Sequence, residues 1–96
     1  LSICHREDGH MRTLPQPPRG DIAKRLKRAA GHLNATIAML ERQRPCLDLA
    51  QQLSAVEAAV IAARRQVVGE QLQICLDGGD VDGSTLRQLK ALARFL

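Results

Sequence analysis

The sequence predicts an all-α fold, because of its composition and the spacing of its apolar residues. Leucine, alanine, valine and isoleucine supply most of the apolar content, which is 45% of 96 residues, and Phe95 is the single aromatic side chain. This composition suits helices better than sheets. Along two long segments the apolar residues recur every three or four positions, the spacing of one helix face. We therefore expect helices packed lengthwise against one another.

The length limits the size of the core. A chain of 96 residues forms one domain at most, and the core of a single copy would be marginal, so we expect an oligomer. Prolines at 15, 17 and 18, among scattered charges, predict a flexible N-terminal arm over residues 1–20. Residues 21–96 are predicted to form a single helical domain, with helices over about 21–43, 45–77 and 84–95.

The first predicted helix combines an apolar stripe with a basic surface. Asp21 is its expected N-cap. Six residues form the stripe: Ile22, Leu26, Ala29, Leu33, Ile37 and Leu40. Away from the stripe the side chains are basic, with almost no compensating acids: Lys24, Arg25, Lys27, Arg28 and His32. Such a run is usually a solvated face, but with so few acids it also suits a polyanionic partner.

The segment from Pro45 to Asp77 is predicted to be one long helix at the centre of an interface. Its apolar residues alternate at spacings of four and three: Leu49, Leu53, Val56, Val60, Ala63 and Val67. A second stripe beside it consists of small residues: Ala55, Ala59 and Ala62. Small side chains there would let a partner backbone approach closely.

Cys46 and Cys75 lie near opposite ends of this segment. At about 100° per residue their separation puts both thiols on nearly the same helix face, and at about 1.5 Å per residue they stand about 43 Å apart. That distance exceeds the reach of a disulfide or a shared metal ion. If two copies pack antiparallel about a two-fold axis near Val60 and Ile61, Cys46 of one comes level with Cys75 of the other. The dimer would then hold two equivalent two-thiol sites.

The end of the chain is predicted to be a loop and a short helix. Residues 78–83 are rich in glycine and aspartate but lack the spacing of an EF-hand, so calcium has little support. Ser84 is the expected N-cap of the last helix. Four leucines are expected to form its packing side: Leu86, Leu89, Leu92 and Leu96.

The net charge favours one class of partner, and the absence of known sequence motifs argues against several classes of function. Fourteen Lys and Arg against ten Asp and Glu give a formal net charge of +4, which favours a polyanion such as DNA. No apolar run reaches the ~20 residues that span a bilayer and no secretory signal is present, so we expect a cytoplasmic protein without a membrane partner. No nucleotide-binding, hydrolase or metalloprotease motif occurs, so we expect no enzyme activity.

The three cysteines are expected to be reduced in the cytoplasm, so each is a core residue, a ligand or a reactive thiol. In the arm, Cys4, His5 and His10 are most simply incidental, since terminal segments are usually poorly ordered. If the arm folds back onto the cysteine site, it could supply a missing ligand.

Several short motifs together resemble the CsoR/RcnR/FrmR family of small, all-helical bacterial repressors. The similarity runs from about Asp21 to Leu96. It is carried by Lys24-Arg25-Leu26, Gly31-His32-Leu33, Met39-Leu40-Glu41, Cys46, Gln52-Leu53-Ser54-Ala55-Val56, and Leu72 with Cys75. The resemblance implies a three-helix protomer, a dimer through the long helix, and a disc-shaped homotetramer that releases operator DNA when an effector occupies the cysteine site.

The chain departs from the family's copper sensors at one ligand. Those sensors use a Cys, then a His four residues before a second Cys, and the matching positions here are Cys46, Gln71 and Cys75. Their outer-shell Tyr and Glu correspond to Pro45 and Gln88. An amide is a poor donor for Cu(I), which counts against copper.

Two thiols without the His resemble the family's persulfide-sensing (CstR-like) branch. Our first hypothesis is therefore a repressor, without cofactor or bound metal, that senses sulfane-sulfur donors through Cys46 and Cys75 of the partner subunit. Crosslinking of the two thiols would release the operator DNA. Family similarity implies Arg25 as a DNA contact, while the second contact position falls on Ala62. The other predicted DNA-binding residues are Lys24, Arg28, Arg64 and Arg65.

Two alternatives stay open. The first is a repressor of the same family that responds to Cu(I) or another metal, with Cys46 and Cys75 as ligands and Cys4 or His5 as a further one. The second is a helical adaptor that does not bind DNA and whose cysteines are incidental.

Overall fold

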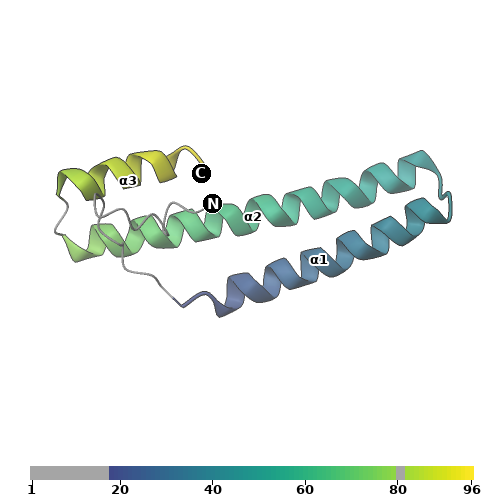
Figure 1. The fold of residues 1–96 in the computed structure, drawn as a ribbon, viewed down its shortest axis with the longest axis horizontal. Coiled ribbons are helices and arrows are strands. Elements are labelled where there is room, and N and C mark those ends of the chain that lie inside the picture. The colour runs from purple at the N-terminus through teal and green to yellow at the C-terminus, as the bar shows by residue number, and fades with distance from the viewer. Residues whose placement is uncertain (1–17, 80–81) are drawn as a thin grey trace. The chain divides into compact units, whose positions relative to one another are not determined.

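The computed structural model describes residues 18–79 and 82–96, and in these ranges the chain forms three helices and no strand. They are α1 (Gly20–Glu41), α2 (Cys46–Gly78) and α3 (Gly83–Ala93), labelled in Figure 1. The all-α prediction is confirmed, and every helix end lies within two residues of its predicted position. Most of the predicted arm lies outside the described residues, with Cys4, His5 and His10.

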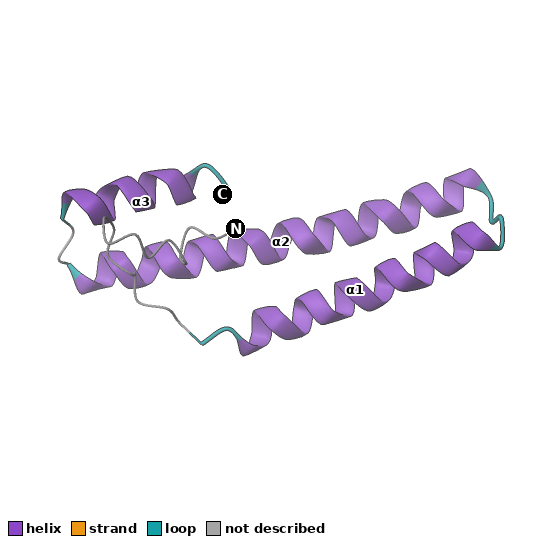
Figure 2. Cartoon of the chain, in the orientation of Figure 1, coloured by secondary structure: helices purple, strands orange, loops and turns teal. Residues whose placement is uncertain are grey.

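The chain divides into two compact units, and each is described by itself. One covers residues 19–64 and holds α1 and the first part of α2, which form an antiparallel hairpin (Figure 2). The other contains residues 65–96, with the last part of α2 and α3. The expected long helix is confirmed, because α2 continues unbroken for 33 residues. A single helical domain over residues 21–96 stays a prediction.

The hairpin turn is formed by a helix C-terminal cap. Gln43 adopts a positive φ of 57°. Its N–H donates to the Leu40 carbonyl at 3.0 Å, and the Arg44 N–H donates to the Met39 carbonyl at 3.1 Å. These two bonds are the Schellman pattern that ends many helices. Pro45 follows directly and cannot continue α1, so the chain reverses and α2 begins one residue later.

Within the hairpin, the buried residues repeat every seven positions. On α1 and α2 together they are Ile22, Ala29, Thr36, Val56 and Ala63. A repeat of seven keeps one narrow seam of each helix against the other. Thr36 was absent from the predicted stripe because it is polar, but its Oγ1 donates to the His32 carbonyl at 2.9 Å, so its hydroxyl is satisfied in the seam.

Six other apolar residues of the predicted stripes are exposed in the single chain. The exposed fraction of these side chains lies between 41% and 60% for Leu26, Leu33, Ile37, Leu40, Leu53 and Val60. A hairpin of two helices covers only one side of each, so a stripe wider than the seam leaves its edge uncovered. That the long helix lies at the centre of an interface stays a prediction.

In the second unit, the core consists of Cys75 and Leu89 with the half-buried Leu72 and Leu92 around them. Of the four leucines predicted to form the packing side of the last helix, only Leu89 and Leu92 lie in this core. Leu86 and Leu96 are about half exposed, whereas Thr85 and Gln88 are buried beside Leu89. The burial of a glutamine on this face was not expected from the sequence.

Both predicted N-caps are wrong. α1 starts at Gly20, one residue before Asp21, so Asp21 lies inside the first turn, where its charge is still favourable at the helix N-terminus. α3 starts at Gly83, which moves its cap upstream of Ser84. There, Asp82 Oδ1 accepts a hydrogen bond from the Thr85 N–H at 2.8 Å.

α2 is long and apolar enough, by length and composition alone, to cross a membrane, contrary to the expectation from the sequence. The mean hydropathy of its most apolar stretch is 1.3. A helix that packs along its whole length against other helices passes the same test, so this finding is weak support for a membrane span.

Replacing Asp82 by alanine removes the acceptor for the Thr85 amide. We expect the free energy of unfolding to fall by about 1 kcal/mol, measured as a lower Tm at a fixed protein concentration. Asp82→Asn keeps an acceptor and should lower the Tm less. Ser84→Ala is the matched control and should stay near the wild type; a larger loss for Ser84→Ala than for Asp82→Ala would contradict this assignment.

Candidate functional site

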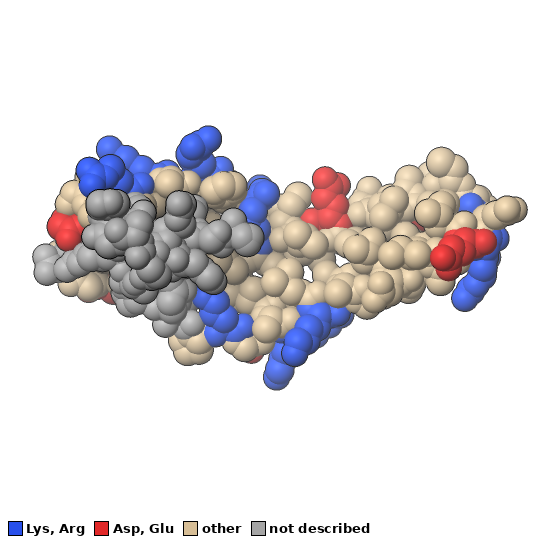
Figure 3. All heavy atoms as spheres, in the orientation of Figure 1, with Lys and Arg blue, Asp and Glu red and all other residues tan. Residues whose placement is uncertain are grey.

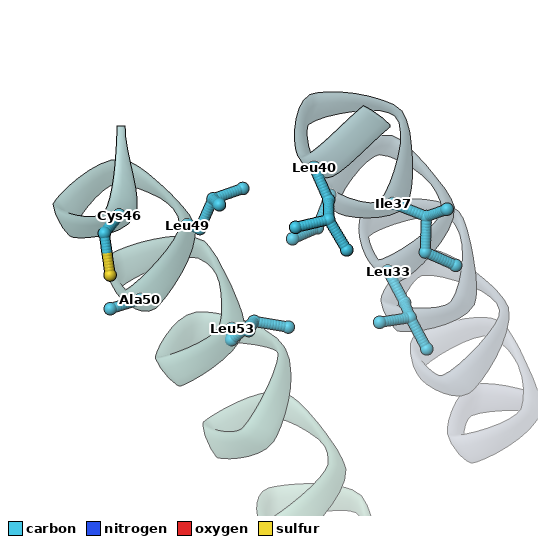
Figure 4. A pocket seen from close by; sticks show the side chains of 8 residues that line it. Leu33, Ile37, Leu40, Cys46, Leu49, Ala50 and Leu53 are labelled. Atoms are coloured by element: carbon cyan, nitrogen blue, oxygen red, sulfur yellow. The ribbon is translucent and has the colours of Figure 1, made fainter. Parts of the chain in front are cut away.

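Cys46 lies at an apolar cleft between α1 and α2. It is the first residue of α2, and its side chain is exposed. The cleft has a volume of about 310 Å³ and is lined by Leu33, Thr36, Ile37, Leu40, Cys46, Leu49, Ala50 and Leu53. Figure 4 shows the leucines of the two helices on opposite sides of this cleft, with the Cys46 sulfur on the α2 side near Ala50. A thiol here is open to solvent yet surrounded by apolar side chains.

Cys75 has different surroundings, in the second unit. Its side chain is only 7% exposed and packs with Leu72, Leu89 and Leu92. The buried Gln71 side chain, one turn earlier on α2, donates an N–H from Nε2 to Cys75 Sγ at 3.5 Å. The polar neighbour of this sulfur on α2 is therefore an amide N–H, and an N–H cannot serve as a metal ligand.

The two thiols lie at opposite ends of α2, as the sequence predicted, and they belong to different units of the chain. Over residues 18–79 and 82–96, no group of three or more His, Cys, Asp or Glu side chains could hold a metal ion. The predicted extra ligands, Cys4 and His5, are outside these ranges. Within these ranges, neither Cys46 nor Cys75 belongs to a group of three or more such side chains.

A second cleft in the hairpin is basic. Its volume is about 170 Å³, and it is lined by Arg25, Arg28, Ala29, His32, Ala59 and Ala62. Lysine and arginine side chains gather over the N-terminal half of α1 on the face seen in Figure 3. Two of the predicted DNA-binding residues, Arg25 and Arg28, therefore come together at one cleft, and Ala62 lies opposite them. Lys24, Arg64 and Arg65 are exposed but do not line it.

One contact across the hairpin was missed by the sequence reasoning. His32 Nε2 and Gln52 Oε1 lie 2.6 Å apart, a hydrogen bond between α1 and α2 beside the basic cleft. No clear signal for it existed in the sequence, because the pairing of α1 with α2 depends on the register that the turn between Glu41 and Cys46 sets.

Comparison with known proteins gives the family. The family model described as a metal-sensitive transcriptional repressor matches residues 19–95. The chain belongs to this family. Its members are transcriptional repressors, not enzymes, so the expected absence of enzyme activity agrees with this assignment. A role as a non-DNA-binding adaptor does not fit a family of repressors.

The chain is similar to proteins named as copper sensors. It is 41% identical over 59 residues to the copper-sensing transcriptional repressor CsoR of Mycobacterium ulcerans, covering 62% of this chain and 50% of that protein. It is 36% identical over the same length to CsoR of Mycobacterium tuberculosis strain H37Rv, with the same coverage. Over 82 residues it is 30% identical to the copper-sensing repressor RicR of that strain, covering 79% of this chain and 85% of RicR.

The chain spans about half the length of the two CsoR proteins it matches. No solved structure is similar enough to count as a match. The names of the relatives favour the copper alternative over the persulfide hypothesis, and membership of the persulfide-sensing branch is not confirmed.

Proposed function

We propose that this chain is a cytoplasmic, DNA-binding transcriptional repressor whose operator affinity is controlled at Cys46 and Cys75, with Cu(I) as the first candidate effector. The observation that carries the proposal is the arrangement of the hairpin, which holds an exposed thiol at one cleft and two arginines at another. Family membership supports the DNA-binding part, and the copper-sensing relatives support the effector.

The proposed active form is an oligomer in which Cys46 meets Cys75 of a partner subunit. Cys46 and Cys75 belong to different units, and over residues 18–79 and 82–96 neither lies in a group of three or more possible ligands, so a second chain is a simple source of the second sulfur. The exposed leucines around Cys46 support association, since apolar side chains such as Leu40 and Leu53, both at least half exposed, gain free energy when a partner covers them. The dimer and tetramer are part of this proposal.

Cu(I) fits the thiols but not the ligand set of the copper sensors that this chain resembles. Soft thiolates select Cu(I) over harder ions, and Cu(I) accepts coordination by as few as two of them. Gln71 occupies the position of the third ligand, and its N–H points to sulfur. We therefore propose that Cys46 of one subunit and Cys75 of its partner hold the ion without a histidine.

Reactive sulfur is the second candidate effector, and the Gln71 contact favours it. An N–H donor beside Cys75 Sγ suits an anionic sulfur, such as a thiolate or persulfide, better than a metal-bound one. One thiolate would take the sulfane sulfur of a donor and expel the donor's thiolate. The partner thiolate would then attack the Sγ atom of the persulfidated cysteine and expel the outer sulfur as hydrosulfide, leaving a disulfide between chains.

The promoter-DNA affinity of the reduced protein distinguishes the two candidate effectors. It is measured after anaerobic addition of Cu(I) in competition with a chelator, and separately after treatment with a persulfide donor. We expect Cu(I) to lower the affinity at a stoichiometry of about one ion per chain. Cys46→Ala and Cys75→Ala should each abolish the response, while Cys4→Ala, the matched control, should keep it. Gln71→His should tighten Cu(I) binding by supplying an imidazole.

Release by persulfide alone, with a Cys46 to Cys75 crosslink between chains in mass spectrometry, would replace Cu(I) by reactive sulfur. If neither agent changes the DNA affinity, the thiols are not the sensor. A crosslink between the two cysteines of the same chain would refute the proposed antiparallel arrangement.

Arg25→Ala and Arg28→Ala should each weaken promoter binding by about fivefold, or about 1 kcal/mol, because each removes one phosphate contact. Each should also reduce the steepness of the salt dependence by about one counterion. Arg42→Ala, an exposed arginine at the other end of α1, is the matched control and should bind like the wild type. Equal losses for Arg42→Ala and Arg25→Ala would mean that net charge, not the cleft, determines binding.

A further inference from the structure

The basic cleft takes all of its polar side chains from one helix. Arg25, Arg28 and His32 come from α1, while α2 contributes the methyl groups of Ala59 and Ala62. The two alanines leave space opposite the cationic groups. A cleft of about 170 Å³ with cationic side chains on one wall suits a small anionic group, and the phosphate of a DNA backbone has that chemistry.

The hydrogen bond to Gln52 determines what His32 can offer to an anion. The side-chain oxygen of glutamine can only accept, so His32 Nε2 is the donor in the 2.6 Å contact. A neutral imidazole has a single N–H, and here Gln52 uses it. The remaining nitrogen, Nδ1, then carries a lone pair and cannot donate to a phosphate oxygen. His32 can therefore contribute to anion binding only as the imidazolium, with a proton on both nitrogens.

We infer that the cleft binds a DNA phosphate with His32 in its protonated form, so that operator binding takes up a proton at each cleft that is engaged. This inference rests on the proposed DNA-binding function and adds a proton-linked contact to it. The charged side chains that line the cleft with His32 are Arg25 and Arg28, both from α1. From α2, the groups nearest to it are neutral: Gln52, Ala59 and Ala62.

The expected consequence is that DNA affinity falls as the pH rises. Histidine changes its charge between about pH 5 and pH 8, and a bound phosphate stabilises the charged ring. Wherever the ring is already protonated before binding, binding takes up no proton. Within it, each engaged cleft adds up to one proton, so the association constant falls by up to about tenfold per pH unit and per cleft.

The test measures promoter affinity of the full-length, reduced, effector-free protein from about pH 6 to pH 8 at constant ionic strength. We expect the wild type to lose affinity steadily as the pH rises, and His32→Gln to have a slope that is smaller by about one proton per engaged cleft. The double variant His5→Gln/His10→Gln removes the other histidines and should keep the wild-type slope.

NMR titration of the His32 ring in the wild-type protein gives a readout that does not depend on how a variant folds. Saturation with promoter DNA should move the midpoint of this titration to higher pH. Inorganic phosphate at matched ionic strength is the second arm, and it should move the midpoint less than DNA does. A larger effect of inorganic phosphate would assign the cleft to a free anion and overturn the DNA assignment.

Equal pH slopes for the wild type and His32→Gln, with an unchanged ring titration on DNA binding, would overturn the inference and leave the proposed function intact. A wild-type protein that binds no promoter DNA at any pH would overturn the proposed function itself. The two failures are therefore distinguishable.

Discussion

The packing of α1 against the first part of α2 is the interaction on which the hairpin depends. Its seam contains Ala29 and Thr36, which are seven residues apart and both buried. Ala29 lines the basic cleft, and Thr36 lines the apolar cleft of Cys46. Two turns of one helix thus separate the candidate sensor from the candidate DNA contacts. A change in the spacing of α1 and α2 at Cys46 is expected to alter the basic cleft, because close-packed seams transmit displacement.

The second unit contributes the other thiol in a contrasting environment. Cys46 is exposed beside leucines, whereas Cys75 is buried beside the amide of Gln71. An effector can reach the exposed Cys46 thiol first. Its access to the buried Cys75 thiol then requires a partner chain or a local opening of the residues that cover it. In the proposed oligomer the two environments meet, so one effector contacts two chains and can stabilise one arrangement of the assembly over another.

Periodicity was sufficient to predict all three helices to within two residues, since a repeat of three and four over long segments leaves little ambiguity. The caps were predicted wrongly because Gly20 and Gly83 are the first residues of their helices. In a sequence, a glycine does not indicate whether it lies inside or outside the end of a helix. Thr36 and Gln88 were missed because burial of a polar residue depends on its hydrogen bonds and neighbours. The roles of Cys46, Cys75 and Arg25 were predicted from spacing and resemblance and stay predictions, whereas the contact of His32 with Gln52 required the register of the hairpin.

The central claim is that each chain carries two half-sites that only a second chain completes. Co-assembly of Cys46→Ala chains with Cys75→Ala chains tests it directly, because a hybrid antiparallel dimer regains one site with both thiols. Neither variant alone should respond to the effector in a promoter-binding measurement. The mixture should regain a response in proportion to the fraction of hybrid dimers, which native mass spectrometry counts. Hybrids that form but show no recovered response would contradict the account.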